Sequence, residues 1–486
     1  MATIVGTQLR GPAGASRPAG DPRLVAPPST GAPVERPVLL SGTALLFAAL
    51  LSMILVEYTG LAKDVPLLKI IRYSTVVAYG LLAFVIGRLG PKALIEYPQS
   101  KALLAFVGFT GFTILYAVVR SYVPASLRAH IDYFALYVTT LYLVDRPRRF
   151  ELLSITCSAI TIALVIRNFP KFLEEQRVAT FTAGYFMGDG NDFAWGLVTL
   201  LPFPAYLILG KRSIVMRLFG VAALGLGLLG VLGTKSRGAA LAVGAAGLFY
   251  WLFLARRRAA AAIGLAVIVA GAAVVAPHGY FDRLKTIEHY EEDTSAQGRL
   301  RAWNAAMQMA IDYPLGVGAG SFNSAFGRFY MPAHVEGYAP NRWISAHSVY
   351  FKVLGEYGIV GVLIVVFVII SAVRVNLASL WKIRADPSRY PISDMWPALL
   401  ALGVVGYAVG AGFLGGINYP HLYFLTGLTM GCHRALLAAE PDPELAAGVA
   451  VPAPAAAGPP LPGRRATGTS MVRARPVTRG KRRFFE

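Results

Sequence analysis

Acidic residues and cysteines are both scarce in this sequence of 486 residues. Asp and Glu number 26 against 46 Lys and Arg, and all charged residues together make up 15% of the chain. The usual charged fraction of a soluble domain is about 25%, so an ordinary soluble protein is excluded. The two cysteines, Cys157 and Cys432, both lie in apolar runs, so the sequence predicts neither a disulfide framework nor a cysteine zinc site.

Apolar residues are abundant instead. They make up 55% of the chain, and the mean hydropathy is +0.54. Apolar runs of about 20 residues recur, and each is long enough to cross a hydrocarbon core as a helix. We therefore predict an all-α polytopic membrane protein with about twelve transmembrane helices. The predicted spans are 38–56, 66–87, 102–119, 130–144, 151–168, 191–209, 214–233, 238–255, 259–277, 349–372, 395–414 and 419–437.

The formal charge of +20 comes from basic residues that lie between the apolar runs and in the C-terminal tail. They do not form one soluble basic face, so they indicate membrane topology and not nucleic-acid binding. Basic clusters such as Arg146 to Arg149 and Arg256 to Arg258 fall on one side of the predicted bundle, and the short loops of the other side hold fewer Lys and Arg. The positive-inside rule then places both termini in the cytoplasm.

This topology divides the chain into five regions. They are a disordered cytoplasmic tail (1–37), helices one to nine (38–277), a periplasmic loop with an amphipathic helix (278–346), helices ten to twelve (347–438) and a disordered basic cytoplasmic tail (439–486).

The long loop carries its own structural signals. Thr294 and Gln297 spell a capping box. The stretch from Gly298 to Tyr313 places Trp303, Met307 and Ile311 at four-residue spacing before Pro314. We therefore predict an amphipathic helix here. The glycine-dense stretch from Pro314 to Phe322 predicts a turn that approaches a neighbouring segment or a ligand closely.

Three arginines at the predicted outer face are candidates for binding phosphate. Arg237 opens the eighth span, and Arg299 and Arg301 lie in the first turns of the loop helix. A guanidinium group stays charged and presents a planar fork of donors that matches phosphate oxygens. The alternatives are an interfacial anchor at position 237 and a solvated helix face at 299 and 301.

His347 lies at the junction of the loop and the tenth span. An imidazole accepts a proton near neutral pH, so this position suits a general base. The alternative is a structural histidine that caps the helix or binds a loop carbonyl.

Polar and aromatic residues at the same predicted face suit a sugar. They are Asn191 and Asp192 at the start of the sixth span, Trp303 in the loop helix and Tyr419 at the start of the twelfth span. The stretch Asp189 to Asp192 has oxygen ligands for a divalent ion as an alternative, although Asn and Asp are also common helix caps.

These motifs together resemble the O-antigen ligase and O-antigen polymerase superfamily. The resemblance rests on Ser-Arg-Gly-Ala at 236–239, the pair Arg299 and Trp303, Asp-Tyr-Pro-Leu-Gly-Val-Gly at 312–318, and His347-Ser348 followed after nine residues by Gly358 and Gly361. It runs from about Gly190 to Gly361. The twelve-span layout extends it to most of the membrane region.

The resemblance implies a bacterial inner-membrane glycosyltransferase that moves a glycan from undecaprenyl diphosphate to an acceptor hydroxyl on the periplasmic side. Arg237 and Arg299 match the family's diphosphate-binding arginines, with Arg301 in reserve for the second, and His347 matches the catalytic histidine. The family implies no metal and no other cofactor. Its partners would be the lipid-linked glycan, an acceptor glycan or lipid A core, and membrane lipids.

Two questions stay open from the sequence. A transporter or flippase for lipid-linked sugars is also polytopic, although the candidate Arg and His residues here gather at one membrane face beside a single large loop. Within the enzyme class, the acceptor is the lipid A core, the growing carrier-bound glycan or a protein hydroxyl. We lean towards a ligase or polymerase because the loop shows no peptide-binding groove.

Overall fold

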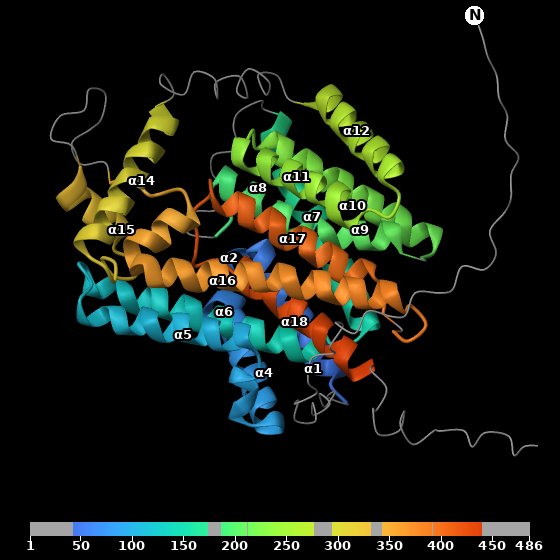
Figure 1. Ribbon diagram of the computed structural model, residues 1–486, viewed down its shortest axis with the longest axis horizontal. Helices are drawn as coiled ribbons and strands as arrows, with labels where there is room; N and C mark the ends of the chain where they lie inside the picture. Colours follow the sequence, from blue (N-terminus) through green and yellow to red (C-terminus); the bar gives the residue numbers. More distant parts are fainter. Residues whose placement is uncertain are drawn as a thin grey trace, which may run out of the picture. The chain divides into compact units, whose positions relative to one another are not determined.

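The computed structural model describes residues 42–173, 186–210, 212–276, 294–331, 343–390 and 392–439 (Figure 1). Within these residues the chain is helical, and no β-strand occurs among them. The helices of five or more residues are α1 (Ala44–Thr59), α3 (Pro66–Ile70), α4 (Tyr73–Leu89), η1 (Pro91–Ile95), α5 (Pro98–Phe112), α6 (Val123–Leu143), α7 (Pro147–Leu173), α8 (Gly190–Leu200), α9 (Pro202–Leu209), α10 (Ile214–Gly233), α11 (Arg237–Phe249), η4 (Tyr250–Leu254), α12 (Arg258–Val275), α14 (Thr294–Asp312), η5 (Phe326–Tyr330), α16 (Val349–Ala385), α17 (Met395–Ala411) and α18 (His421–Ala439). Shorter turns of helix are α2 (Leu61–Asp64), η2 (Thr113–Leu115), η3 (Arg120–Tyr122) and α15 (Phe322–Ala325). The predictions for the two tails fall on residues 1–41 and 440–486, outside the described residues.

Each predicted span overlaps a helix or a consecutive pair of helices. The sixth span is the pair α8 and α9, which Pro202 separates. The fourth span begins earlier than predicted, because α6 starts at Val123 and not near residue 130. Among the described residues, six helical segments are long and apolar enough to cross a membrane, and three shorter helices are also apolar. This composition is that of an all-α membrane protein.

Contacts between helix ends agree with a layout of alternating spans. On one side, Arg167 at the end of α7 pairs with Asp64 of α2 at 2.6 Å. On the other side, Arg256 and Arg384 both bind the carboxylate of Asp394, at 2.9 and 3.1 Å. Each contact joins ends that the predicted topology puts on the same side. Which side faces the cytoplasm stays a prediction.

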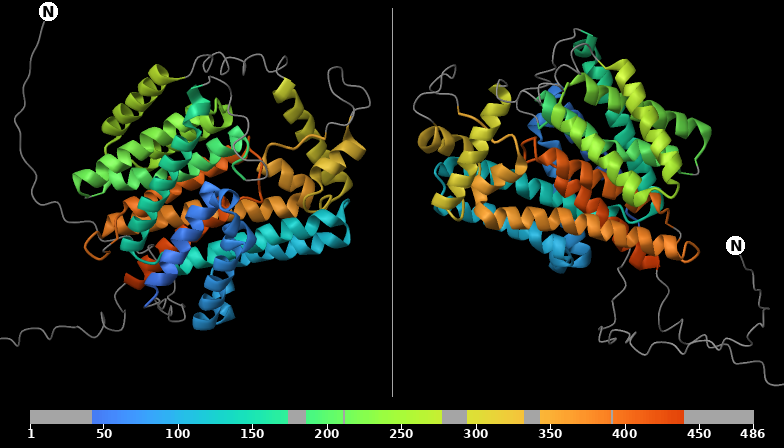
Figure 2. Two further views of the ribbon diagram at one scale, coloured as in Figure 1. Left: turned by 180° about the vertical axis from the view of Figure 1, so that it is seen from behind. Right: turned by 45° about the horizontal axis from the view of Figure 1, so that its top comes forward.

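Helix α18 lies in the core and packs against α6, α16 and α17 (Figures 1 and 2). Two of its glycines lie against backbone carbonyls of α6 and the residue after it. A Cβ atom at Gly427 would lie 2.8 Å from the Tyr137 carbonyl oxygen, and one at Gly431 would lie 2.7 Å from that of Val144. Small residues at these points let the two helices approach closely, as is common in membrane bundles.

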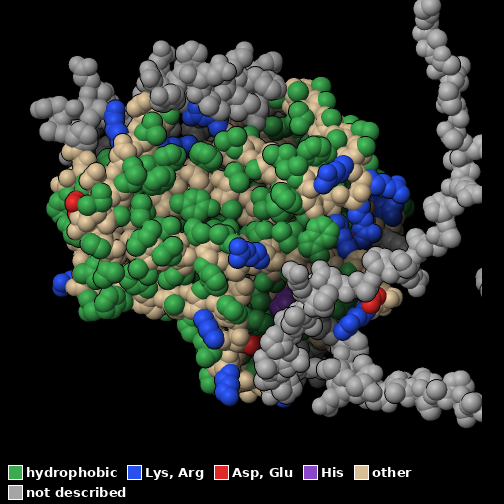
Figure 3. All heavy atoms as spheres, viewed as in Figure 1, with side chains coloured by type: hydrophobic (Ala, Val, Ile, Leu, Met, Phe, Trp, Pro, Cys, Tyr) green, Lys and Arg blue, Asp and Glu red, His purple; other side chains and the backbone are tan. Residues whose placement is uncertain are grey.

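The outer surfaces of the helices carry large apolar side chains. Figure 3 shows apolar side chains spread over the face in view. Exposed examples from three helices are Leu218 and Val221 (α10), Ile263, Val267 and Val274 (α12), and Ile359, Leu363 and Phe367 (α16). Apolar surface of this extent is unfavourable in water and suits hydrocarbon, so lipid contact explains it.

The glycine-dense turn from Pro314 to Ser321 docks onto α16. The amide nitrogens of Val317 and Gly318 donate to the carbonyl oxygens of Gly355 and Glu356, at 2.8 and 3.0 Å. At Gly358 the helix is interrupted, with φ 63° and ψ −164°. The close approach predicted for this turn is therefore confirmed. Its partner is the interrupted segment of α16.

Buried Glu356 fixes the far end of the same turn. Its Oε1 accepts a hydrogen bond from the Phe322 amide at 3.4 Å, and the side chain is 1% exposed. The turn thereby connects the end of α14 to the helix that follows His347.

Replacing Gly316 with alanine is expected to separate the turn from α16. Gly316 has φ 83°, and an added Cβ would lie 2.3 Å from the Glu356 carbonyl carbon. Overpacking of this kind costs about 1–3 kcal/mol, and the left-handed backbone adds about 1–2 kcal/mol for a residue with a Cβ. Thermal unfolding of the purified protein in detergent should show a clearly lower Tm.

Gly225→Ala in α10 is the matched control for this substitution. No atom lies within 4 Å of a Cβ placed there, and its backbone is helical. Alanine favours a helix over glycine by about 1 kcal/mol, so Tm should stay the same or rise. Equal Tm values for the two variants would contradict the docking described above.

Candidate functional site

His347 lies directly before α16 and has an unusual backbone conformation. Its φ of 44° is in the left-handed region, which residues with a Cβ adopt uncommonly and which is enriched at functional positions. Ser348 follows as the N-cap of α16: its Oγ accepts from the Phe351 amide at 3.5 Å and donates to the Ala411 carbonyl oxygen at 3.4 Å. The helix start is thereby held against the end of α17, and His347 is exposed.

The connection between α17 and α18 supports both the His347 and the Arg237 segments. A Cβ atom at Gly415 would lie 3.2 Å from the Cα atom of His347. A Cβ atom at Gly238 would lie 2.8 Å from the Cβ atom of Phe413. The two segments are 110 positions apart in sequence, yet both contact this short connection. The structure therefore brings the start of α11 and the start of α16 together.

Arg237 is the first residue of α11 and is half-buried. Ser236 caps the helix, because its Oγ accepts from the Ala239 amide at 3.4 Å. Lys235, just before the cap, has φ 52° in the left-handed region. The guanidinium is thus carried by a fixed helix N-terminus, an end whose dipole favours anions.

Helix α14 confirms the predicted loop helix and ends at Asp312, before Pro314. Its packed face differs from the apolar spacing noted in the sequence. Met307 and Ile311 are 43% and 69% exposed, and the buried side chains are small alanines with Met309. Tyr330 of η5 donates to the Asp312 carboxylate at 2.6 Å, and burial together with this carboxylate raises the pKa of Tyr330. The phenol therefore stays protonated and holds η5 to α14.

Trp303 joins α14 to the residue before His347. Its Nε1 donates to the Ala346 carbonyl oxygen at 2.9 Å. Its ring also stacks on Phe351 of α16, with centroids 4.8 Å apart and planes 12° apart. Trp303 thus holds the loop helix α14 against the start of α16. This positioning role is separate from the sugar contact predicted for it.

Helical spacing separates the two loop arginines. Arg299 is four residues before Trp303, so both project from the same side of α14. Arg301 is two residues before Trp303 and projects from a different side. Both are half-buried, and the Nε atom of Arg299 is buried. Arg299 is therefore on the side of α14 that reaches Ala346.

Asp192 and Tyr419 form a direct pair. The Tyr419 hydroxyl donates to the Asp192 carboxylate at 2.6 Å, across 227 positions of sequence. Asp189 accepts from the Asn191 amide at 2.6 Å as the N-cap of α8, so the cap interpretation of this stretch holds. In the part of the chain that the structure describes, no group of three His, Cys, Asp or Glu side chains is arranged to bind a metal ion.

Lys352 is a further candidate that the motifs did not single out. It lies on α16 one turn after Ser348 and is half-buried. It is an ionisable side chain within an apolar helix, near the end that follows His347. One signal was available in the sequence: an ionisable residue inside an apolar span is a functional candidate by default.

Part of the chain matches a known protein family. Residues 222–366 match the model of the family described as O-antigen ligase. Arg237, Arg299, Arg301, Trp303 and His347 all fall within the matched residues. Asn191, Asp192 and Tyr419 lie outside the match, although Asp192 and Tyr419 are paired in the structure.

No curated protein matches the chain. The family match and the apolar helices together indicate a multi-pass membrane protein with a glycosyl-transfer type of activity. The match over residues 222–366 supports the resemblance to the O-antigen ligase and polymerase superfamily that the sequence motifs indicate.

Proposed function

We propose that this protein transfers a glycan from undecaprenyl diphosphate to an acceptor hydroxyl on the periplasmic side of the bacterial inner membrane. The observation that carries the proposal is the meeting of the Arg237 and His347 segments at the connection between α17 and α18. Both segments lie within the residues that match the O-antigen ligase family. In this topology both termini are cytoplasmic and the site faces the periplasm.

The lipid diphosphate is the leaving group of the reaction. Negative charge builds on its bridging oxygen as the bond to the anomeric carbon breaks, and positioned cations stabilise that charge in the transition state. Arg237 and Arg299 would bind the diphosphate, each with a planar fork of donors. Arg301 remains the alternative for the second diphosphate-binding arginine. Arg299 is preferred because it projects from the same side of α14 as Trp303.

The acceptor hydroxyl needs a base. His347 would take the hydroxyl proton while the acceptor oxygen forms its bond to the anomeric carbon and the diphosphate leaves with the electron pair of the broken bond. A single displacement of this kind inverts the anomeric configuration. Arginine and histidine supply the charge and the base, so the reaction is proposed to need neither a metal nor another cofactor. Asn191, Trp303 and the pair Asp192 and Tyr419 are proposed to line the sugar site.

Lys352 is proposed as a third cation of the site. It lies one turn after the Ser348 cap, and its backbone amide donates to the Ser348 carbonyl oxygen at 2.9 Å, so it follows His347 closely on α16. In Lys352→Gln we expect transfer to fall by about tenfold, because a hydrogen bond to a charged group contributes about 1.5–3 kcal/mol.

Lys382→Gln is the matched control, since Lys382 is exposed near the opposite end of the same helix. Transfer rates at equal protein level give the comparison, and the control should stay within about twofold of the unaltered protein. Equal activity of both variants would remove Lys352 from the site.

The proposed function is tested by reconstitution. Purified protein in liposomes receives a labelled undecaprenyl diphosphate glycan with one of three acceptors: lipid A core, a carrier-bound glycan or a peptide hydroxyl. We expect a glycosylated product with lipid A core or carrier-bound glycan, released undecaprenyl diphosphate, and the same rate with EDTA. Movement of the intact lipid-linked glycan across the bilayer without product would instead indicate a flippase.

One structural feature bears on that transport alternative. Transporters bind substrate at interrupted helices near the bilayer midplane. The interruption of α16 at Gly358 is filled by the chain itself, because a Cβ there would lie 2.0 Å from the Pro314 carbonyl oxygen. This interruption is therefore a docking point for the loop and has no room for a substrate.

A further inference from the structure

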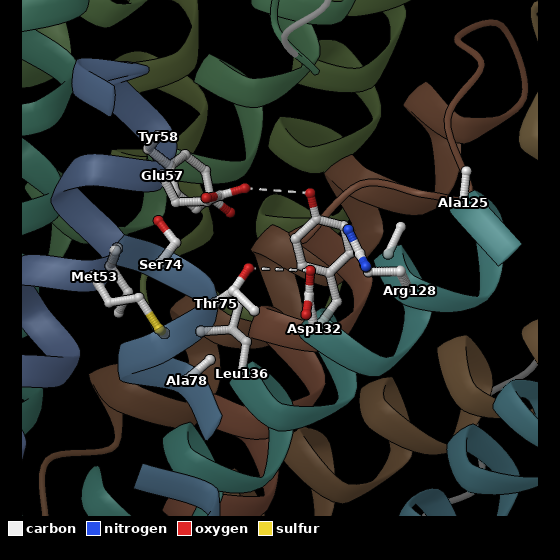
Figure 4. A pocket seen from close by; sticks show the side chains of 13 residues that line it. Met53, Glu57, Tyr58, Ser74, Thr75, Ala78, Ala125, Arg128, Asp132 and Leu136 are labelled. Atoms are coloured by element: carbon white, nitrogen blue, oxygen red, sulfur yellow. Dashed lines mark hydrogen bonds between the residues drawn. The ribbon is translucent and has the colours of Figure 1, made fainter. Parts of the chain in front are cut away.

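A pocket of about 190 Å³ lies between α1, α4 and α6, apart from the residues discussed so far (Figure 4). Its polar lining comes from the ends of these helices that the predicted topology places at the periplasmic face. Figure 4 shows Glu57 of α1, Thr75 of α4, and Arg128 and Asp132 of α6 around the same space. The site proposed above uses none of these side chains.

The two carboxyl groups of the pocket differ in their hydrogen bonding. Glu57 accepts from the Tyr133 hydroxyl at 3.3 Å and also bonds the Ser74 side chain. Asp132 accepts from the Thr75 hydroxyl at 3.4 Å and also bonds Tyr79. The second oxygen of Asp132, Oδ1, is buried and has no hydrogen-bond partner among the described residues. A buried acceptor without a donor is costly, so a ligand that brings donor hydrogens would be favoured here.

The balance of charges narrows the class of ligand. The lining contains two carboxyl groups, those of Glu57 and Asp132, and one arginine, the exposed Arg128, and this composition disfavours a phosphate or another anion. A metal ion prefers more carboxylate or imidazole ligands than this pair, and within the described ranges no group of three is present. A neutral ring with several hydroxyl groups fits, because hydroxyls donate to carboxylates and accept from a guanidinium.

The volume of the pocket limits how many sugar rings it can hold. Pockets that enclose drug-sized molecules measure about 300–1,000 Å³. A volume of about 190 Å³ is smaller and suits a single ring. Tyr58 and Tyr133 add aromatic side chains to the lining, as sugar sites commonly do.

The pocket is connected to the proposed sugar site through packed side chains. The Tyr58 hydroxyl lies 3.1 Å from Nδ1 of His421. Phe186 contacts both Tyr58 and Tyr419, with ring centroids 5.5 and 5.7 Å away. Tyr419 in turn binds Asp192. One layer of aromatic residues therefore separates the pocket from the Asp192 and Tyr419 pair.

From this arrangement we infer that the pocket between α1, α4 and α6 binds one sugar ring of a glycan substrate, at a distance from the transferred bond. The inference rests on the proposed function, since that function supplies the glycans. The ring belongs to the donor glycan or to the acceptor glycan, and the two sources are separated by the experiment.

The test measures KM for donor and for acceptor separately, with the full chain in liposomes. Glu57→Gln and Asp132→Asn remove the negative charges and keep the side-chain shapes. We expect KM for one glycan substrate to rise about tenfold, with kcat within about threefold, because the lost hydrogen bonds act equally on the ground and transition states. The substrate whose KM rises is the one that the pocket holds.

Ala125→Trp is the second variant, because Ala125 is an exposed residue of the lining and a large side chain there would obstruct the space without removing a charge. Asp64→Asn is the matched control: Asp64 is an acidic residue at the same predicted face, but it pairs with Arg167 and does not line the pocket. Its KM values should equal those of the unaltered protein.

Calorimetric titration of the same proteins with the donor glycan freed of its lipid, and with the lipid-free acceptor glycan, completes the design. Transfer by the unaltered protein, with both KM values unchanged in Glu57→Gln, Asp132→Asn and Ala125→Trp, would overturn the inference and leave the function intact. Binding that the three variants weaken, in the absence of any transfer, would support the pocket and refute the function. If neither transfer nor binding is observed, the inference and the proposed function are both refuted.

Discussion

Replacing His347 with alanine is expected to lower glycan transfer by about 10²–10⁴-fold, the usual contribution of a positioned general base. The protein should still insert and accumulate, because His347 is exposed and outside the hydrophobic core. Without the imidazole, the acceptor hydroxyl has no group to take its proton during attack. Transfer of a labelled glycan in membranes, normalised to the amount of protein, measures the effect.

The backbone of His347 requires a second variant. Its left-handed conformation, with φ 44°, is strained for alanine as well, so a loss in His347→Ala could come from a shifted helix start. Asparagine adopts this conformation more readily and cannot act as a base near neutral pH. His347→Asn should therefore lose transfer as fully as His347→Ala. Activity near that of the unaltered protein in either variant would remove the base assignment.

Arg237→Lys is expected to lower transfer by about 10–100-fold, although the positive charge is kept. Lysine presents a point charge in place of a planar fork, so it cannot bind two oxygens of the diphosphate in the same way. If the fork acts mainly on the leaving group, kcat should fall and KM for the donor should change little. Initial rates over a range of donor concentrations separate the two parameters.

Arg120→Lys provides the comparison for this substitution. Arg120 lies at the same predicted face, is exposed, and donates to the Leu115 carbonyl oxygen at 3.2 Å. An exposed arginine of this kind contributes little to stability, so the transfer rate of the variant should stay within about twofold of that of the unaltered protein. An equal loss in both variants would point to a general effect of surface charge.

Much of the fold could be predicted from the sequence, because hydropathy and helix signals act locally. Every predicted span overlaps a helix, and the helix predicted between the ninth and tenth spans ends before Pro314 as expected. Of the three residues at four-residue spacing in that helix, Trp303 packs against α16, whereas Met307 and Ile311 are exposed. Alanine side chains let α14 approach α16 closely, and such contacts leave a weak hydropathy signal.

The contacts within the candidate site could not be predicted from the sequence as well as the helices could. The pairing of Asp192 with Tyr419 joins residues 227 positions apart, and no local pattern encodes it. The left-handed backbone of His347 lies between two long-range contacts, of Ala346 with Trp303 and of Ser348 with Ala411, which exist only in the folded chain. The same holds for the pocket, whose acids come from separate helices.

The central claim is that a lipid diphosphate binds at the periplasmic end of the bundle between the Arg237 and Arg299 segments, with its sugar facing His347. A structure of the His347→Ala protein with an undecaprenyl diphosphate glycan, determined in a lipid disc, tests it most directly. We expect phosphate density in contact with both guanidinium groups, and the anomeric carbon next to residue 347. Phosphate density near the middle of the membrane, or far from Arg237, would contradict it.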